Sequence, residues 1–190
     1  MNPRRQTELV VDANVARAAS SAEGGGPPDG RPGGSCGIRT REVLEVIRKN
    51  SRLGVVFSPR LLDEWKKHEG NFARKWRLSM VARKRCRGLG EKANRHEPLE
   101  EAASSLSPSA WEAVRKDSHL IAAALLADGI VVSLDRDFRG HLVKLCASVG
   151  ELASLRWCNP CDEPGENGKG DCKEWLRSGF PGRKEFRLCP

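Results

Sequence analysis

The sequence has no apolar run that approaches the roughly 18 residues needed to cross a bilayer. It also lacks, near its first residues, the short apolar core that is typical of signal peptides. These absences predict a cytoplasmic protein with no membrane partner. Hydrophobic residues make up only 38% of the 190 residues, and the mean hydropathy is −0.53. We therefore expect one sizeable core together with segments that stay outside it.

The cysteines and histidines show no metal-binding framework. The four histidines lack ligand spacing, and the seven cysteines are odd in number and scattered. This pattern favours free thiols in a reducing compartment over a disulfide framework. Cys158 and Cys161 form a C-x-x-C pair that is half of a zinc site, but Cys172 and Cys189 follow at irregular spacing. Zinc is therefore the weaker of the two interpretations.

The chain is basic, with a net charge of +8 and an isoelectric point near 9.4. This balance favours a polyanionic partner, nucleic acid first and an acidic membrane surface second. Nine Lys or Arg residues and one acid lie between Phe72 and Arg95. We expect a basic helix at 74–87 that binds nucleic acid through Arg74, Lys75, Arg77, Arg83, Lys84, Arg85 and Arg87. The alternative is an ordinary solvated face whose long side chains cover Trp76.

Short β-branched runs alternate with segments of helical periodicity along most of the chain. The expected strands are 8–12, 53–57, 129–134 and 152–157. The expected helices are 13–20, 40–50, one from Pro59, a basic one from Phe72, one from Pro108, 138–149 and a short one at 172–177. This alternation predicts an α/β domain of three layers, α/β/α, around a central, mostly parallel sheet.

Two segments do not fit into that alternation. Residues 21–37 are rich in Gly and Pro, and we expect them to form a mobile insertion, either a functional flap or a tolerated loop. Residues 161–190 form a Cys-containing C-terminal extension. The α/β domain is therefore expected to span 8–160.

Several acids are attached to apolar elements. Asp12 and Asp135 end two expected strands, and such ends share one edge of a parallel sheet. Asp117 lies within the apolar stripe of its helix, and Glu64 lies beside core positions of another. Carboxylates that meet in one pocket repel unless cations join them, and oxygen ligands suit Mg²⁺ or Mn²⁺. Phosphodiester hydrolysis is the reaction that best uses such ions.

Each acid also has a simpler explanation. Asp12 and Asp135 can cap the helices that follow them, and Glu64 can be a solvated helix residue. Asp137, one alternation beyond Asp135, is either a further ligand or part of a helix-capping turn. Asp117 is the strongest candidate, because an unpaired carboxylate facing a core costs several kcal/mol.

Four motifs in order resemble those of PIN-domain nucleases, the group that includes the VapC-type toxin ribonucleases. They are VVDANV at 10–15, SPRLLDE at 58–64, DSHLIAAA at 117–124 and VSLDRDF at 132–138. The resemblance covers roughly Leu9 to Pro160 and includes the order and spacing of the motifs. The insertion and the Cys-containing tail depart from the family pattern.

The resemblance implies a function and a set of roles. Asp12, Glu64, Asp117 and Asp135 would form the catalytic acidic quartet that holds Mg²⁺ or Mn²⁺, and Asp137 would be an auxiliary ligand. Asn14 and Ser133 would orient the substrate or the acids. The implied activity is endonucleolytic cleavage of RNA by a metal-activated water, with an antitoxin protein and a homodimer as candidate partners.

Other functions remain open at this stage. One alternative is a PIN-fold module that binds RNA or assembles with other proteins but has little catalytic activity. The Asp-x-Asp of Asp135 and Asp137 also occurs in TOPRIM-like enzymes, which would place Glu where this chain has Asp12. A haloacid-dehalogenase-like phosphatase would need a second Asp where this chain has Asn14.

Overall fold

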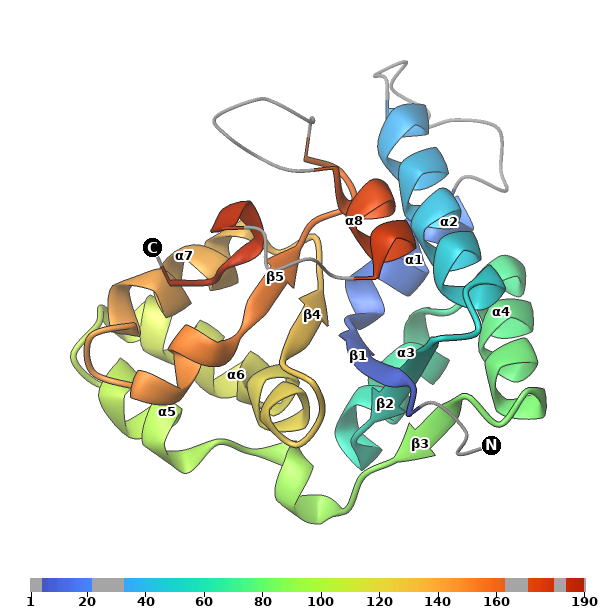
Figure 1. Cartoon of the computed structure of the whole chain (residues 1–190). Coiled ribbons are helices and arrows are strands. Elements are labelled where there is room, and N and C mark those ends of the chain that lie inside the picture. The colour runs from blue at the N-terminus through green and yellow to red at the C-terminus, as the bar shows by residue number, and fades with distance from the viewer. Residues whose placement is uncertain (1–4, 22–32, 163–170, 180–183, 190) are drawn as a thin grey trace.

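The computed structural model describes residues 5–21, 33–162, 171–179 and 184–189, which form an α/β domain (Figure 1). The strands are β1 (Thr7–Val11), β2 (Leu53–Phe57), β3 (Cys86–Gly88), β4 (Ile130–Val132) and β5 (Arg156–Cys158). Within the described residues they form one five-stranded sheet in the order β3-β2-β1-β4-β5. All four pairings are parallel. The predicted fold class is confirmed.

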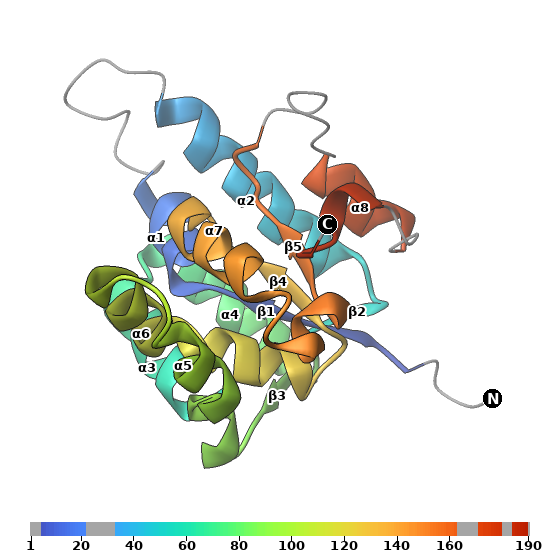
Figure 2. The same ribbon diagram turned by 90° about the vertical axis from the view of Figure 1, so that its left-hand side faces the viewer.

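Helices lie on both faces of the sheet, as Figures 1 and 2 show from two directions. They are α1 (Ala13–Ser21), α2 (Gly33–Lys49), α3 (Pro59–His68), α4 (Asn71–Ala82), α5 (Glu97–Ala103), α6 (Pro108–Leu125), α7 (Arg136–Leu145) and α8 (Cys172–Ser178). Because both faces are covered, the central strands carry apolar residues on both faces: β4 is apolar throughout, and β1 is apolar from Leu9 to Val11. Leu9, Val10 and Val11 of β1 are almost completely buried, as expected for a parallel sheet.

Two helices begin as the sequence predicts. The Ser58 hydroxyl accepts a hydrogen bond of 3.1 Å from the Leu61 N–H at the start of α3. Ser107 caps α6 in the same way, and proline occupies an early position in both helices. Serine satisfies an N–H that has no partner within the helix, and proline has no N–H to satisfy there. These two starts position Glu64 and Asp117.

The start of α2 differs from the prediction. The helix begins at Gly33, so Thr40 lies within it and does not cap it. The Thr40 hydroxyl donates a hydrogen bond of 2.7 Å to the Cys36 carbonyl, one turn earlier. The insertion predicted for 21–37 is therefore shorter at its C-terminal end, and residues 22–32 of it lie outside the described residues.

The basic helix predicted for 74–87 is also shorter than expected. Helix α4 ends at Ala82, Lys84 adopts a positive φ of 55°, and the chain continues into the edge strand β3. Three residues are too few to show strand periodicity in a sequence. Two other segments also differ from the predicted secondary structure. Part of the polar stretch after His96 forms the short helix α5, and residues 150–154 form a 3₁₀ turn before β5.

The prediction of free thiols is wrong for six of the seven cysteines. Among the described residues, disulfides join Cys36 to Cys161, Cys146 to Cys189 and Cys158 to Cys172, and Cys86 is free. The C-x-x-C pair is therefore divided between two disulfides and forms no zinc knuckle. Partners up to 125 residues apart in the sequence meet only in the folded chain, so spacing alone did not reveal the pairs.

The described part of the C-terminal extension packs against the domain. Trp175 and Leu176 of α8 are buried, and Trp175 stacks on Phe186 with ring centroids 4.3 Å apart. The extension thus contributes to the same core as the sheet. None of the helices in the described ranges has the length and apolar character of a membrane span.

Candidate functional site

The strand order reverses at β1, which has β2 on one side and β4 on the other. In open parallel sheets, ligands bind outside the carboxyl ends of the strands at such a reversal. Asp12 directly follows β1, and its N–H donates to the Val132 carbonyl of β4 at 3.0 Å. Ser133 directly follows β4. The first and fourth motifs therefore meet at the place where this type of fold forms a ligand site.

A hydrogen-bond network holds these two strand ends together. The Ser133 hydroxyl donates to Asp12 Oδ2 at 2.7 Å, and the Asn14 N–H donates to Asp12 Oδ1 at 3.2 Å. The Asn14 amide donates to the Ser133 hydroxyl at 3.2 Å and accepts from the Leu134 N–H at the same distance. Asn14 and Ser133 thus orient Asp12, which is the geometry that the family resemblance implies for them.

Asp12 is buried, with 8% of its surface exposed. Burial raises the pKa of its carboxyl from 3.8 to about 6, and the hydrogen bonds from Ser133 and Asn14 only partly oppose this rise. The negative charge of Asp117 raises the pKa further, and His119 opposes it. Asp12 is therefore close enough to both residues of α6 to interact with their charges.

Asp117 lies half-buried in the middle of α6. Burial raises the pKa of its carboxyl above the usual value, and the charges of Glu64 and Asp135 raise it as well, against the opposing charges of Lys116 and His119. Asp117 therefore interacts with the acids of the second and fourth motifs. This arrangement places all four predicted acids in one electrostatic cluster.

His119 connects the second and third motifs. Its side chain is completely buried, and its Nε2 lies 3.1 Å from Glu64 Oε2, although the approach is not aligned as a hydrogen bond. Arg60 Nε lies 3.4 Å from the other Glu64 oxygen. Burial raises the pKa of Glu64, but His119 and Arg60 together outweigh this effect and hold the pKa below its usual value. The contact of His119 with Glu64 joins residues of two different helices, so it depends on tertiary structure and no local sequence pattern predicts it.

Asp135 and Asp137 belong to the first turn of α7. The Asp135 carboxylate caps the helix by accepting a hydrogen bond of 2.7 Å from the Phe138 N–H. Asp137 is exposed in the same turn, where an acid stabilises the positive end of the helix dipole. Helix capping, the simpler explanation, thus accounts for the hydrogen bond of Asp135 and for the position of Asp137 in the first turn. Asp135 still acts on Asp117 through its charge.

The cluster does not form a closed set of ligands. In the described ranges, no group of three or more His, Cys, Asp or Glu side chains is placed to hold a metal ion. Donors within the protein engage the oxygens of Asp12, Glu64 and Asp135 instead. The donor chemistry nevertheless fits a hard divalent cation, because all four acids are carboxylates. Burial is the main cause of the raised pKa values of Asp12 and Asp117, and neighbouring carboxylates add to it.

Four of the seven predicted nucleic-acid-binding cations have partners within the protein, among them Arg83, which donates to the Arg48 carbonyl at 3.5 Å. Arg77 forms an ion pair with Glu69, and Arg87 forms one with Glu8. Arg85 is buried and donates to the carbonyls of Arg48, Asn50 and Leu53, where α2 ends and β2 begins. The other three, Arg74, Lys75 and Lys84, are exposed, as is Arg83. The basic run is therefore partly structural.

A second group of cations lies beside the acids. A hollow of about 760 Å³ extends from Arg60, the partner of Glu64, to Lys116, the neighbour of Asp117. Arg95 and Arg115 also line it, and the Arg115 guanidinium lies over the Trp111 ring at 4.9 Å. We call this hollow the flanking groove. Its cations are far apart in the sequence, so no local pattern groups them.

Comparison of the chain with models of known protein families and with curated protein sequences finds no match. The resemblance to PIN-domain nucleases therefore receives no support from these comparisons. It depends on the four motifs and on their meeting at one edge of the sheet.

Proposed function

We propose that the protein is a metal-dependent endoribonuclease that hydrolyses RNA phosphodiester bonds at the acidic cluster. The observation that carries the proposal is the convergence of Asp12, Glu64, Asp117 and Asp135, from four separate segments, on the point where the strand order reverses. Such a concentration of carboxylates is costly unless it binds a cation. Mg²⁺ or Mn²⁺, when bound, would supply an activated water and stabilise charge on the phosphate.

The residues of the chain have separate tasks in this proposal. Asp12 and Asp117 would be the principal cation ligands, because burial raises the pKa of both carboxyl groups and a bound cation would stabilise their charged forms. Asn14 and Ser133 hold the Asp12 carboxylate in one orientation. The flanking groove would bind the phosphates of the RNA strand on one side of the cleaved bond through Arg60, Arg115 and Lys116. Asp137 remains a candidate auxiliary ligand.

A second candidate function is an RNA-binding or assembly module on the same fold, with little catalytic activity. It is favoured by one observation: donors within the protein already engage Asp12, Glu64 and Asp135. The two functions differ in their response to divalent ions. A nuclease needs them for turnover, whereas a binding module does not.

The deciding experiment is cleavage of a fluorescently labelled single-stranded RNA in Mn²⁺ or Mg²⁺, with and without a chelator. We expect cleavage that the chelator abolishes and that falls by at least about a hundredfold in Asp117→Asn. The matched control is Asp63→Asn, which removes an exposed carboxylate next to Glu64 and should cleave like the wild type. Equal cleavage by Asp117→Asn and wild type would refute the assignment. Metal-independent RNA binding without cleavage would favour the binding module.

No observation here identifies an antitoxin or a second copy of the chain as a partner, so the proposal includes neither. The cytoplasmic location stays a prediction. The three disulfides weigh against it, because disulfides are typical of oxidising environments.

A further inference from the structure

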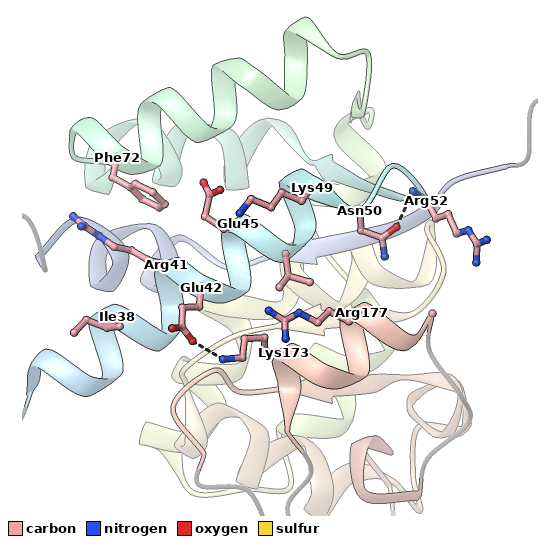
Figure 3. A pocket seen from close by; sticks show the side chains of 12 residues that line it. Ile38, Arg41, Glu42, Glu45, Lys49, Asn50, Arg52, Phe72, Lys173 and Arg177 are labelled. Carbon is pink, nitrogen blue, oxygen red and sulfur yellow. Dashed lines mark hydrogen bonds and ion pairs between the residues drawn. The ribbon is translucent and has the colours of Figure 1, made fainter.

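A second groove lies away from the acidic cluster, between α2, α4 and α8 (Figure 3). It has a volume of about 820 Å³, and none of the four acids lines it. Arg52, at one end, precedes β2 and so lies at the amino edge of the sheet, whereas Asp12 lies at the carboxyl edge. We call this hollow the α2–α8 groove. Its position separates it from the proposed nuclease site.

The floor of the α2–α8 groove is apolar. Val46 and Phe72 line it, and the Ile38 side chain is 54% exposed at one end. The Arg41 guanidinium lies over the Phe72 ring at 4.9 Å. An exposed large aliphatic side chain on a partly apolar surface is a feature of surfaces that bind other proteins. In Figure 3 the Ile38 side chain extends from α2 and the Phe72 ring extends from α4. Apolar side chains of a bound partner would remove them from water.

The rim of the groove is cationic. Five basic residues line it, namely Arg41, Lys49, Arg52, Lys173 and Arg177. The two lining acids are already paired, Glu42 with Lys173 at 2.7 Å and Glu45 with Arg48. Lys49 and Arg52 are exposed, and among the described residues neither has a carboxylate partner. The rim therefore has an excess of positive charge toward solvent.

The wall formed by α8 is held firmly in place. Cys172, at its first position, is joined to Cys158 of β5, and Trp175 and Leu176 are buried. The Asn50 amide donates to the Leu176 carbonyl at 3.2 Å, which joins the C-terminal part of α8 to the end of α2. The C-terminal extension thus gives this groove one of its two long sides.

We propose that the α2–α8 groove binds an acidic amphipathic helix of a partner protein. Its apolar floor fits the apolar face of such a helix, and its cationic rim complements carboxylates along the flanks. RNA fits less well, because the floor of the groove is apolar. This inference does not depend on the proposed nuclease activity.

The test uses a synthetic helical peptide with leucines along one face and glutamates along the other. Isotope-labelled full-length protein is titrated with it and followed by NMR. We expect saturable shift changes confined to α2, α4 and α8. A peptide with lysines in place of the glutamates should cause none, because the charges then repel.

Variants define the contact. The double variant Lys49→Gln, Arg52→Gln should weaken peptide binding about tenfold, and Ile38→Ser should weaken it as well. All three side chains are exposed, so the fold is retained. Lys67→Gln, an exposed cation on α3, is the matched control and should bind like the wild type.

Three results would overturn the proposal: no shift changes at millimolar peptide, equal changes with the lysine peptide, or displacement of the acidic peptide by single-stranded RNA. The last result would assign the groove to nucleic acid. RNA cleavage by the wild type is measured in a separate assay. Failure of the peptide to bind would therefore leave the proposed nuclease function unaffected, and absence of RNA cleavage would leave the proposed peptide binding unaffected.

Discussion

The Ser133 hydroxyl donates a hydrogen bond of 2.7 Å to the Asp12 carboxylate, although 121 residues separate the two in the sequence. The bond joins the carboxyl ends of the two strands at the reversal of strand order, β1 and β4. It is also the largest influence that lowers the pKa of Asp12 against burial. The fold thus holds the first acid of the cluster in a fixed orientation.

Removing this bond should raise the pKa of Asp12 further. In Ser133→Ala the carboxylate loses a donor while burial remains, so we expect a pKa above the value of about 6. NMR titration of the Asp12 side-chain carbon measures it directly. Ser148→Ala, which changes an exposed serine in the turn after α7, is the control and should leave the titration as it is. An unchanged pKa in Ser133→Ala would contradict the role given to this hydroxyl.

The raised pKa of Asp12 has a consequence for stability. The folded state binds this proton more tightly than the unfolded chain does, so the free energy of unfolding falls as pH rises from about 4 to about 6. The shift corresponds to a cost of about 3 kcal/mol above that range. Asp12→Asn removes the titrating group and should be more stable than the wild type, by up to that amount, near pH 7.5.

Urea denaturation at about pH 4 and about pH 7.5 checks this prediction, because linkage requires the difference between variant and wild type to grow with pH. Both measurements are made in chelator so that bound cations do not contribute. Equal free energies of unfolding for the wild type and Asp12→Asn near neutral pH would contradict the prediction. They would show that contacts within the protein offset the cost of burying the Asp12 charge.

The elements and the acids differ in how far the sequence could predict them. The strands before Asp12 and Asp135 contain the unbroken apolar runs Leu9–Val11 and Ile130–Val132, and Ser58 and Ser107 mark helix starts, so local patterns sufficed. The edge strand β3 is too short to show a pattern, and the disulfides pair cysteines that meet only through tertiary folding. His119 reaches Glu64 for the same reason, because α3 and α6 are brought together by packing.

Arg85 illustrates the limit of charge patterns. Sequence context groups it with surface cations, but its guanidinium is buried against carbonyl oxygens of the α2–β2 turn. Arg85→Ala should lower the free energy of unfolding by about 2–4 kcal/mol, because several buried acceptors lose their donor. The exposed Arg74→Ala should change it by less than about 0.5 kcal/mol. Urea denaturation of both variants measures this, and equal stabilities would show that Arg85 has no structural role.

The three disulfides predict a count of reactive thiols. Alkylation of the protein in denaturant without reductant should modify one cysteine, Cys86, and alkylation after reduction should modify seven. Intact-mass spectrometry gives both counts. Reduction should also lower the melting temperature, since the closed loops restrict the unfolded chain. Seven reactive thiols before reduction would mean that the cysteines are free, as their spacing first indicated.

The claim that the four acids form one cation site is tested most directly by titrating the chelator-treated protein with Mn²⁺ in a calorimeter near neutral pH. We expect the wild type and Asp63→Asn to bind Mn²⁺ saturably and to gain in melting temperature. We expect Asp12→Asn to lose that binding. A wild type that neither binds Mn²⁺ nor gains thermal stability from millimolar Mn²⁺ or Mg²⁺ would contradict it.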